Sequence, residues 1–508
     1  MNTAPPIVWS IAGTDSGGGA GLSADQRAAD AFGVHLCPVV AAVTAQHSLA
    51  VEHVEPLRPE LLDAQLAALA DDLPPTVIKT GLLGSAANVE RVAAWIDRLR
   101  ERRPVALVVD PVLGASTGRS FADDTLLQAY RQHLLPRTTL LTPNRAEAAR
   151  LLGPVAPDLP QQAAALREAG CQAVALTGGD HPALHGDVLD WIDTPQARGW
   201  LALPRVDTRH THGTGCTFAS SAAAALALGF TPADAAVLAK MATTHALRHG
   251  REAGAGAGPV VAGVGFGTDP ALMPRLSWGE AARFMPLPTD ADPSADLGLY
   301  ALLDDAERTP ALLALGVRLL QLRLKTARPP REAVQRFITH CRAAGAMGYV
   351  NDHWQLAMEC GAQGVHLGQE DLLALGDDGR DALLASGLAL GISSHSLWEL
   401  ARARALAPRY IACGPVWPTE TKAMPWRPQG LDNLAWWCTM AGAPVVAIGG
   451  LLHADQFEAA ARSGPAAACA VRVIGDRPER TVPLLQLAWQ RGRTAPRRDP
   501  PALPHPML

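Results

Sequence analysis

The chain of 508 residues lacks the cysteine spacing of a zinc site or of a disulfide framework. Its eight cysteines are scattered and none forms a Cys-x-x-Cys pair, so reduced thiols in the cytosol are the simplest expectation. No apolar run is long enough to span a bilayer, and no basic segment precedes the short apolar run near the N-terminus. These absences predict a soluble, cytoplasmic protein with no signal peptide and no membrane partner.

A strong charge of either sign is also absent. The 44 basic and 49 acidic residues leave a net charge of −5, which gives no reason to expect a nucleic acid as partner. Hydrophobic residues make up 48% of the chain and charged residues 18%, so a large core is possible. The chain is longer than one core usually holds, and we therefore expect two domains.

The first half alternates short apolar runs with helical segments, which is typical of a doubly wound α/β domain. The expected strands and the polar or small residues that end them lie at Ile7–Ala12, Cys37–Thr44, Val77–Gly81, Ala106–Pro111, Thr139–Asn144 and Gln172–Asp180. A glycine-rich loop, Gly13–Gly21, follows the first strand and favours a ligand site at this edge of the sheet. The loop matches neither a P-loop nor a clean GxGxxG pattern, so a plain turn is the alternative.

A second glycine-rich turn, Thr211–Cys216, opens a helix. Gly213 and Gly215 permit backbone angles at which several N–H groups point to one spot, at the positive end of the helix dipole. Such a nest suits a phosphate in transfer. Cys216 lies at the same end, which predicts a lowered thiol pKa, although a small buried residue is the alternative role.

Two further polar features each allow two interpretations. Gln46 stands where an expected strand leaves the core, as either a ligand-facing amide or a surface or capping amide. Asn144 and Glu147 are three residues apart and share one helix face. That spacing predicts either a capping box or a site for Mg²⁺ and phosphate.

Several motifs of the first half occur together. They are Gly13-Thr-Asp-Ser-Gly-Gly-Gly-Ala-Gly-x-x-Ala-Asp25, Ala45-Gln46, Lys79-x-Gly81, Val109-Asp-Pro-Val112, Thr142-Pro-Asn-x-x-Glu147 and His212-Gly-Thr-Gly-Cys216. With these motifs, about residues 5–262 resemble the hydroxymethylpyrimidine and hydroxymethylpyrimidine-phosphate kinases of the ribokinase-like fold. One departure is Thr177, which stands where the family often has a lysine before Gly-Gly.

The resemblance implies the roles of individual residues in this half. Gln46 would hydrogen-bond the aminopyrimidine, and Asp25 would lie in the same pocket. The 213–216 loop would hold the transferring phosphoryl group, with Cys216 at the acceptor hydroxyl. A kinase of this kind takes ATP as the phosphoryl donor, and the nest together with Mg²⁺ near Asn144 and Glu147 could supply the charge stabilisation that phosphoryl transfer needs. We further expect a homodimer formed through this half.

The composition changes between the halves and again at the end of the chain. Residues 265–296 are rich in Pro, Gly and Asp and are interpreted as a linker, which leaves residues 1–264 for the first domain. Residues 491–508 contain a basic, proline-rich run and are interpreted as a flexible tail.

The second half, residues 297–490, predicts a (β/α)₈ TIM barrel with its site at the C-terminal ends of the strands. Eight short apolar runs are separated by helical segments, at Leu297–Leu303, Arg318–Leu324, Gly348–Asn351, Gly364–Leu367, Leu390–Ser393, Tyr410–Cys413, Val445–Ile448 and Ala467–Val473. Gln321, Arg323 and Lys325 alternate, so they point to one side of a strand, which favours an anion or, alternatively, an internal salt-bridge layer. Asp352 and Asp371 follow neighbouring strands and predict a Mg²⁺ site for a diphosphate.

The motifs of the second half are Gln321-Leu-Arg-x-Lys325, Val350-Asn-Asp352, Gly364-Val-His-Leu-Gly-Gln-Glu-Asp371, Gly414-Pro-x-x-Pro-Thr-x-Thr-Lys422 and Ala447-Ile-Gly-Gly450. With them, about residues 296–488 resemble thiamin-phosphate synthase. The resemblance implies that hydroxymethylpyrimidine diphosphate is held by Gln321, Arg323, Lys325, Asn351, Ser393 and Lys422. It also implies Mg²⁺ on Asp352 and Asp371, and thiazole phosphate on Thr419, Thr421 and Gly450.

One residue of this half departs from the family pattern. Arg472 stands where the family usually has a serine, and we expect it to pair with the thiazole phosphate.

These patterns predict a bifunctional enzyme of thiamin biosynthesis. Its kinase half would phosphorylate hydroxymethylpyrimidine twice, and its barrel would couple the diphosphate to thiazole phosphate. Two alternatives stay open at this point. In one, the first half has a pyridoxal-type kinase activity. In the other, one half is a degenerate module that only binds thiamin phosphate and regulates the other half.

Overall fold

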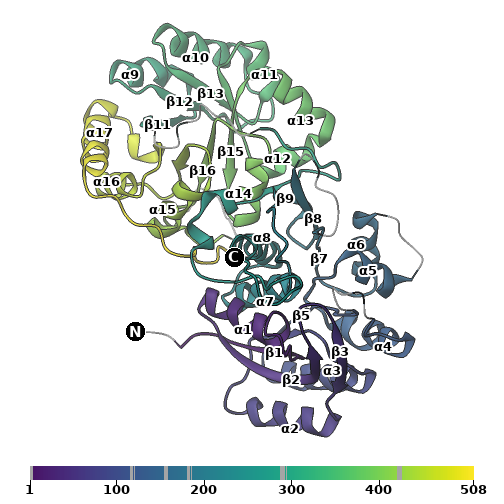
Figure 1. Cartoon of the computed structure of the whole chain (residues 1–508). Coiled ribbons are helices and arrows are strands. Elements are labelled where there is room, and N and C mark those ends of the chain that lie inside the picture. The colour runs from purple at the N-terminus through teal and green to yellow at the C-terminus, as the bar shows by residue number, and fades with distance from the viewer. Residues whose placement is uncertain are drawn as a thin grey trace. The chain divides into compact units, whose positions relative to one another are not determined.

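The computed structural model describes residues 4–114, 118, 120–153, 158–179, 184, 186–286, 292, 295–419 and 426–508. The chain forms two compact units, residues 1–267 with 271–274 and residues 268–270 with 275–508 (Figure 1). Within the described part of the chain, no helix is both long and apolar enough to cross a membrane.

The first unit is built on one mixed sheet. Its strands run in the order β9-β8-β7-β6-β5-β4-β1-β2-β3. Pairing is parallel from β2 through β1, β4, β5 and β6 to β7, and antiparallel at β3, β8 and β9. The strands are β1 (Ile7–Gly13), β2 (His35–Gln46), β3 (Val51–Pro56), β4 (Val77–Thr80), β5 (Ala106–Val109), β6 (Leu140–Leu141), β7 (Val174–Leu176), β8 (Asp187–Asp193) and β9 (Arg198–Pro204).

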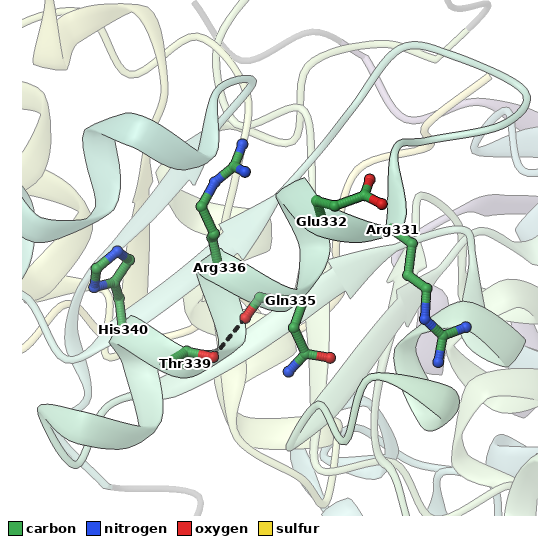
Figure 2. Close-up of a pocket in the computed structure, with 6 residues that line it drawn as sticks. All are labelled: Arg331, Glu332, Gln335, Arg336, Thr339 and His340. Carbon is green, nitrogen blue, oxygen red and sulfur yellow. Dashed lines mark hydrogen bonds between the residues drawn. The ribbon is translucent and has the colours of Figure 1, made fainter.

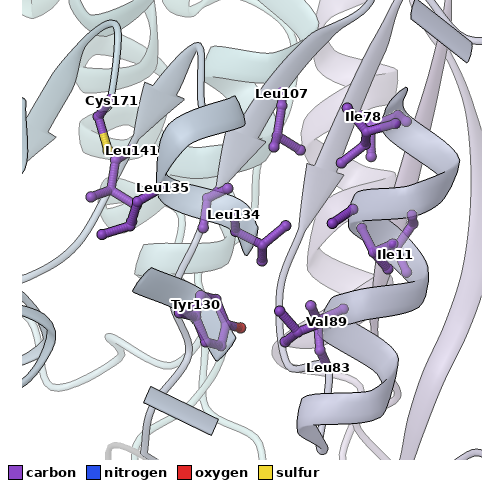
Figure 3. Close-up of a cluster of buried hydrophobic side chains, with 14 of the residues drawn as sticks. Ile11, Ile78, Leu83, Val89, Leu107, Tyr130, Leu134, Leu135, Leu141 and Cys171 are labelled. Carbon is purple, nitrogen blue, oxygen red and sulfur yellow. The ribbon is translucent and has the colours of Figure 1, made fainter. Parts of the chain in front are cut away.

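Helices cover both faces of this sheet, as predicted for a doubly wound domain. They are α1 (Gly21–Phe32), α2 (Pro59–Ala70), α3 (Ala86–Arg100), α4 (Asp124–Ala129), α5 (Arg145–Leu152), α6 (Leu159–Glu168), α7 (Thr214–Ala227) and α8 (Pro232–Arg248). On one face, buried side chains of α2 to α6 join those of the strands in a single core; Figure 3 shows part of it, from Ile11 to Cys171. On the other face α1, α7 and α8 pack on the sheet, and four successive fully buried alanines of α7 permit close approach.

The second unit is the predicted barrel. Its eight strands are all parallel, and β18 pairs with β11 to close the ring. The strands are β11 (Gly298–Leu303), β12 (Leu319–Leu322), β13 (Met347–Asn351), β14 (Gly364–Leu367), β15 (Ala389–Ser394), β16 (Tyr410–Cys413), β17 (Val445–Ala447) and β18 (Ala467–Ala470). The helices are α9 (Thr309–Ala314), α10 (Arg331–Ala343), α11 (Trp354–Glu359), α12 (Gln369–Ala374), α13 (Gly376–Ala385), α14 (Leu397–Arg404), α15 (Gly430–Met440), α16 (Ala454–Arg462) and α17 (Pro478–Thr494).

Three tyrosines fill one level of the barrel interior: Tyr300, Tyr349 and Tyr410 are each 1% exposed and meet edge to face. Glycines make room for two of the rings. A Cβ at Gly391 would lie 2.2 Å from Cζ of Tyr410, and one at Gly364 would lie 2.4 Å from Cε1 of Tyr349.

The segment that we expected to be a linker is divided between the two units. Phe266 is buried and its ring packs on Phe32 of the first unit. Trp278 packs in the second unit, where its indole N–H donates to the carbonyl of Arg402 at 2.9 Å. Apolar side chains thus fix the start and the middle of a segment whose proline content alone predicts a spacer.

The expected flexible tail also has defined contacts. Residues 478–494 form α17, and the chain beyond it packs on α15. Asn433 accepts a hydrogen bond from the backbone N–H of His505 at 2.9 Å, and Met507 is fully buried. Burial of this methionine holds the end of the chain in place, although the composition before it is typical of a flexible segment.

Candidate active sites

The two glycine-rich loops of the first unit touch each other. Gly213 is the N-cap of α7 with a left-handed backbone, φ 84°. A Cβ at this position would lie 2.2 Å from the carbonyl oxygen of Gly19, so only glycine fits. A Cβ at Gly215 meets nothing within 4 Å, and this residue is exposed. The N-terminus of α7 therefore presents an open face beside the first loop, as the phosphate-nest prediction requires.

Asp15 connects these two loops through hydrogen bonds. It was not among the site residues predicted from the sequence. Its carboxylate accepts hydrogen bonds from the backbone N–H groups of Gly17, Gly19 and Ala20 at 2.7–2.9 Å. Nε2 of His212 lies 2.9 Å from the same carboxylate. Burial favours a higher pKa for Asp15, but hydrogen bonds from His212, Gln46 and the backbone outweigh it and hold the pKa well below its usual value. An aspartate inside a glycine-rich loop is the sequence signal for such a turn.

Gln46 lies at the same loop. Its side chain hydrogen-bonds Asp15, and its backbone N–H and carbonyl both bond the Ser16 hydroxyl, at 2.8 and 2.7 Å. The residue is only partly buried, so part of it is accessible to solvent. Its contact with an aminopyrimidine stays a prediction.

Asp25, which the family resemblance implies to lie in the ligand pocket, is fully buried in a hydrogen-bond network. Its carboxylate accepts from Nζ of Lys79 at 2.9 and 3.0 Å and from the hydroxyls of Ser10 and Ser220 at 2.6 and 2.7 Å. Its hydrogen-bonding capacity is therefore largely used inside the protein. The sequence analysis did not identify Lys79 as the partner of this carboxylate. A lysine within the apolar run 77–81 was the available signal, because a buried cation needs an anionic partner.

Asp110 completes this charged network. Its Oδ2 lies 3.8 Å from Nζ of Lys79, and burial raises the pKa of Asp110 although Lys79 opposes the rise. Burial favours a lower pKa for Lys79, but the nearby negative groups Asp25, Cys216 and Asp110 outweigh it and hold that pKa above its ordinary value. Lys79 is thus a permanent cation below the α7 loop.

The predicted low pKa of Cys216 is wrong. Burial raises the pKa of this thiol to about 12, and the attraction of Lys79 is too weak to reverse the rise. The positive end of one helix contributes about 0.3–1 kcal/mol, which is less than the cost of desolvating a thiolate. Cys216, the one cysteine that is not fully buried, is therefore a neutral thiol at the edge of the nest.

Asn144 and Glu147 form a complete capping box, which was one of the two interpretations of their spacing. The Asn144 side chain accepts from the backbone N–H of Glu147 at 2.9 Å, and the Glu147 carboxylate accepts from the backbone N–H of Asn144 at 2.9 Å. Both residues are partly buried at the start of α5. The box does not itself test the Mg²⁺ interpretation, which stays a prediction.

In the barrel, the predicted residues of β12, β13 and β15 gather at the strand ends. Gln321 and Asn351 are 2% and 9% exposed, Ser393 and Arg323 are partly buried, and Lys325 is exposed. The side-chain nitrogen of Gln321 is buried without a hydrogen-bond partner among the described residues. A buried unpaired amide is costly, so this position favours a polar ligand.

Asp352 and Asp371 lie close enough to affect each other. Burial raises the pKa of Asp352, Asp371 raises it further, and Arg323 opposes both. Asp371 also accepts from the backbone N–H of Gly368 at 2.9 Å, which fixes one of its oxygens. Two repelling carboxylates suit a divalent cation. No group of three or more His, Cys, Asp or Glu side chains able to hold a metal occurs in the described ranges.

The expected thiazole-phosphate residues are only partly within the described residues. Thr421 and Lys422 lie outside them, whereas Thr419 lies at the edge of the described part. Gly450 has φ 75°, and a Cβ there would lie 2.6 Å from the Trp417 carbonyl oxygen, so the loops after β16 and β17 pack closely. Arg472 is exposed just after β18.

A cavity of about 460 Å³ lies elsewhere, along the outer face of α10 (Figure 2). It is lined by Arg331, Glu332, Gln335, Arg336, Thr339 and His340. Two of its cations are already in ion pairs with Glu359 and Glu307. None of the predicted site residues lines it.

Comparison with protein families divides the chain in the same way. Residues 15–261 match phosphomethylpyrimidine kinase, and residues 300–474 match thiamine monophosphate synthase.

Individual relatives match either most of the chain or about half of it. A thiamine biosynthetic bifunctional enzyme from Arabidopsis thaliana is 34% identical over 465 residues, which cover 88% of this chain and 85% of the relative. A hydroxymethylpyrimidine/phosphomethylpyrimidine kinase from Synechococcus elongatus is 42% identical over 262 residues, 51% of this chain and 97% of the relative. Among solved structures, a Staphylococcus aureus pyridoxal kinase in complex with ADP is 28% identical, covers 51% of this chain and 93% of its own, and has a TM-score of 0.46.

Proposed function

Because the chain belongs to the family of bifunctional thiamine biosynthetic enzymes, we propose that its two halves carry out consecutive steps through the residues described above. The first half is a kinase that phosphorylates hydroxymethylpyrimidine and its monophosphate to the diphosphate. The second half is a thiamine-phosphate synthase that couples this diphosphate to hydroxyethylthiazole phosphate and releases pyrophosphate. The observation that carries this conclusion is the similarity to a bifunctional relative over 88% of the chain.

In the kinase half, we assign the transferring phosphoryl group of ATP to the open face at Gly215. Backbone N–H groups at the start of α7 would stabilise the charge of this group, which is the main requirement of phosphoryl transfer. Gln46 would bind the amino-substituted ring from the facing loop. Because Cys216 is a neutral thiol, we assign it to positioning the acceptor hydroxyl rather than to removing its proton as a thiolate.

Mg²⁺, when bound in this half, supplies charge compensation for the phosphates of ATP. The capping box at the start of α5 engages one oxygen each of Asn144 and Glu147. A contact through water therefore fits these two residues better than direct ligation, which agrees with the tendency of Mg²⁺ to keep several waters.

In the barrel, we assign the pyrimidine diphosphate to the strand ends that carry Gln321, Arg323, Asn351 and Ser393, together with Lys325 and Lys422. Mg²⁺, when bound at Asp352 and Asp371, supplies charge compensation for the departing pyrophosphate. The cationic side chains stabilise the same leaving group, and no protein nucleophile is required. Thr419, Thr421, Gly450 and Arg472 are assigned to the thiazole phosphate.

We also propose a homodimer through the kinase half. The edge strand β3 is the observation in support, because an exposed edge offers unpaired backbone groups to a second copy. Light scattering of the whole protein tests this directly. A mass of about 107 kDa, twice the 53.3 kDa of one chain, is expected, and a mass of one chain would contradict it.

The experiment that tests the assignment measures each half separately. Kinase activity is followed with hydroxymethylpyrimidine phosphate and ATP, and synthase activity with added pyrimidine diphosphate and thiazole phosphate. Competition with pyridoxal tests the pyridoxal-kinase alternative, because the two rings present different hydrogen-bonding edges to Gln46. Preferential phosphorylation of pyridoxal, or a half without activity, would contradict the proposal.

A further inference from the structure

A chain of hydrogen bonds runs through the barrel interior to one of the predicted substrate residues. The hydroxyl oxygens of Tyr300 and Tyr410 are 2.7 Å apart. The Tyr410 hydroxyl is 2.8 Å from Nδ1 of His366, and Nε2 of His366 is 2.8 Å from Oγ of Ser393. The first three residues are almost fully buried, whereas Ser393 is partly exposed at the end of β15. The chain therefore connects the closed interior to the open end of the barrel.

Packing fixes the geometry of this chain. The rings of His366 and Tyr410 stack with centroids 5.7 Å apart and an angle of 13° between their planes. Gly391, the register partner of both residues, leaves the space that the Tyr410 ring occupies. Neither ring can therefore turn away from its partner without opening a gap in the core.

His366 is the member whose tautomer decides the direction of the chain, because both of its ring nitrogens are hydrogen-bonded. Burial, together with the nearby positive groups Arg323 and His395, lowers the pKa of His366 to about 4. A neutral imidazole donates from one ring nitrogen and accepts at the other. Tyr300 and Tyr410 remain protonated, because burial raises both phenol pKa values well above 10.

Only one direction gives every buried proton an acceptor. The Tyr300 hydroxyl has Tyr410 as its one hydrogen-bond partner in the part of the chain that is described, so its proton must go there. Tyr410 then donates to Nδ1 of His366, and Nε2–H of His366 donates to Ser393. In the opposite direction, Tyr300 would keep a buried proton without an acceptor, which is costly.

We propose that Tyr300, Tyr410 and His366 form a relay that makes the Ser393 hydroxyl a hydrogen-bond donor toward an acceptor atom of the pyrimidine diphosphate. Tyr410 and His366 are then positioning residues of the synthase, since they act through Ser393. The inference rests on the proposed function, because it takes Ser393 to contact this substrate. It adds that the serine selects substrates that present an acceptor, not a donor, at this point.

Nitrogen NMR of the whole protein with ¹⁵N-labelled histidine tests the direction without any assay of activity. The His366 signals, assigned by their loss in His366→Gln, are expected to be those of the neutral Nε2–H form at pH 7. In Tyr410→Phe the Nε2–H form should no longer dominate. An Nδ1–H form or an imidazolium in the unmodified protein would overturn the proposal. These spectra remain informative even if the synthase assignment fails.

Kinetics with added pyrimidine diphosphate test the positioning role. Tyr410→Phe is expected to raise KM for the diphosphate about tenfold, the effect of one hydrogen bond, and to change kcat less. Tyr349→Phe is the matched control, because it removes a hydroxyl of the same interior level that is not part of the chain, and it should leave KM unchanged. Tyr300→Phe is a milder change that should also raise KM. It replaces Tyr410→Phe in the test if that variant fails to fold.

A double-mutant cycle separates positioning from a general packing effect. In a Ser393→Ala background, Tyr410→Phe should raise KM no further, since the relay then has nothing to orient. Additive effects of the two substitutions, or an equal effect of Tyr349→Phe, would overturn the proposal. If the unmodified chain forms no thiamin phosphate from added diphosphate, the proposed function fails instead.

Discussion

Nζ of Lys79 lies 2.9 Å from Oδ1 of Asp25, and both side chains are almost wholly buried. This pair links the elements that carry the two glycine-rich loops, because Ser220 of α7 and Ser10 of β1 both donate hydrogen bonds to the Asp25 carboxylate. The orientation of α7, and hence of the proposed phosphate nest, therefore depends on a charged pair inside the sheet.

Removal of one partner of this pair should be severe. Lys79→Met leaves a buried carboxylate without its cation, and the expected loss is about 3–5 kcal/mol of unfolding free energy. Thermal unfolding of the whole protein measures it. Arg102→Gln is the control, because the Arg102–Asp71 pair is largely exposed and should change stability by less than about 1 kcal/mol. Equal melting temperatures for the two variants would contradict the role of Lys79.

The two glycines of the α7 turn should respond differently to alanine. Gly213→Ala adds a Cβ at a left-handed position against the Gly19 carbonyl, and the conformation alone costs about 1–2 kcal/mol. Gly215→Ala meets open space and should leave the melting temperature unchanged. Comparison of the two melting temperatures tests the close approach of the loops, which would be wrong if both variants melted alike.

The Cys216 thiol should react slowly with alkylating agents at neutral pH. Since its pKa is about 12, the reactive thiolate is scarce between pH 7 and 9. Mass spectrometry of the native protein treated with iodoacetamide measures the rate, and the other seven cysteines are buried. A peptide containing one free cysteine serves as the control. Faster labelling of Cys216 than of the peptide at pH 7 would restore the low-pKa interpretation.

The paired carboxylates of the barrel should control its need for Mg²⁺. Asp371→Asn removes one negative ligand, and the Mg²⁺ concentration for half-maximal pyrophosphate release is expected to rise at least about tenfold. Asp378→Asn, an exposed change on α13, is the control and should not alter this concentration. An unchanged Mg²⁺ requirement in Asp371→Asn would remove this residue from the metal site.

The barrel should lose stability in mild acid because of His366. The folded protein holds this imidazole neutral until about pH 4, whereas the unfolded chain protonates it near pH 6.5. The stability that the neutral imidazole contributes to the folded state is therefore fully present above pH 6.5 and is lost as pH falls toward 4. The total loss of unfolding free energy is on the order of 3 kcal/mol. His366→Asn should show a smaller fall in melting temperature from pH 7 to pH 4.5. An equal or larger fall would contradict the neutral buried state.

Both folds could be predicted from short-range patterns. The apolar runs correspond to strands, and the glycine-rich turns at Gly13–Gly21 and Thr211–Cys216 lie at strand and helix ends, because backbone conformation is encoded locally. The Thr231 cap of α8 is a further case, accepting from the Asp234 N–H at 3.2 Å.

Features that depend on distant residues could not be predicted. The charge balance at Cys216 requires knowledge of Lys79, Asp25 and Asp110, which lie far apart in the sequence. The packing of Met507 on α15 is likewise set by an apolar site that no local pattern reveals. A charged residue inside an apolar strand indicates that Lys79 has a buried anionic partner. It does not indicate which residues those partners are.

The most direct test of the central claim is one reaction with the pure protein, hydroxymethylpyrimidine, hydroxyethylthiazole phosphate, ATP and Mg²⁺. We predict thiamin phosphate as the product, detected by mass spectrometry, and no product when any one of the three substrates is omitted. Consumption of ATP without thiamin phosphate, although both halves are folded, would contradict the claim that this single chain performs both steps.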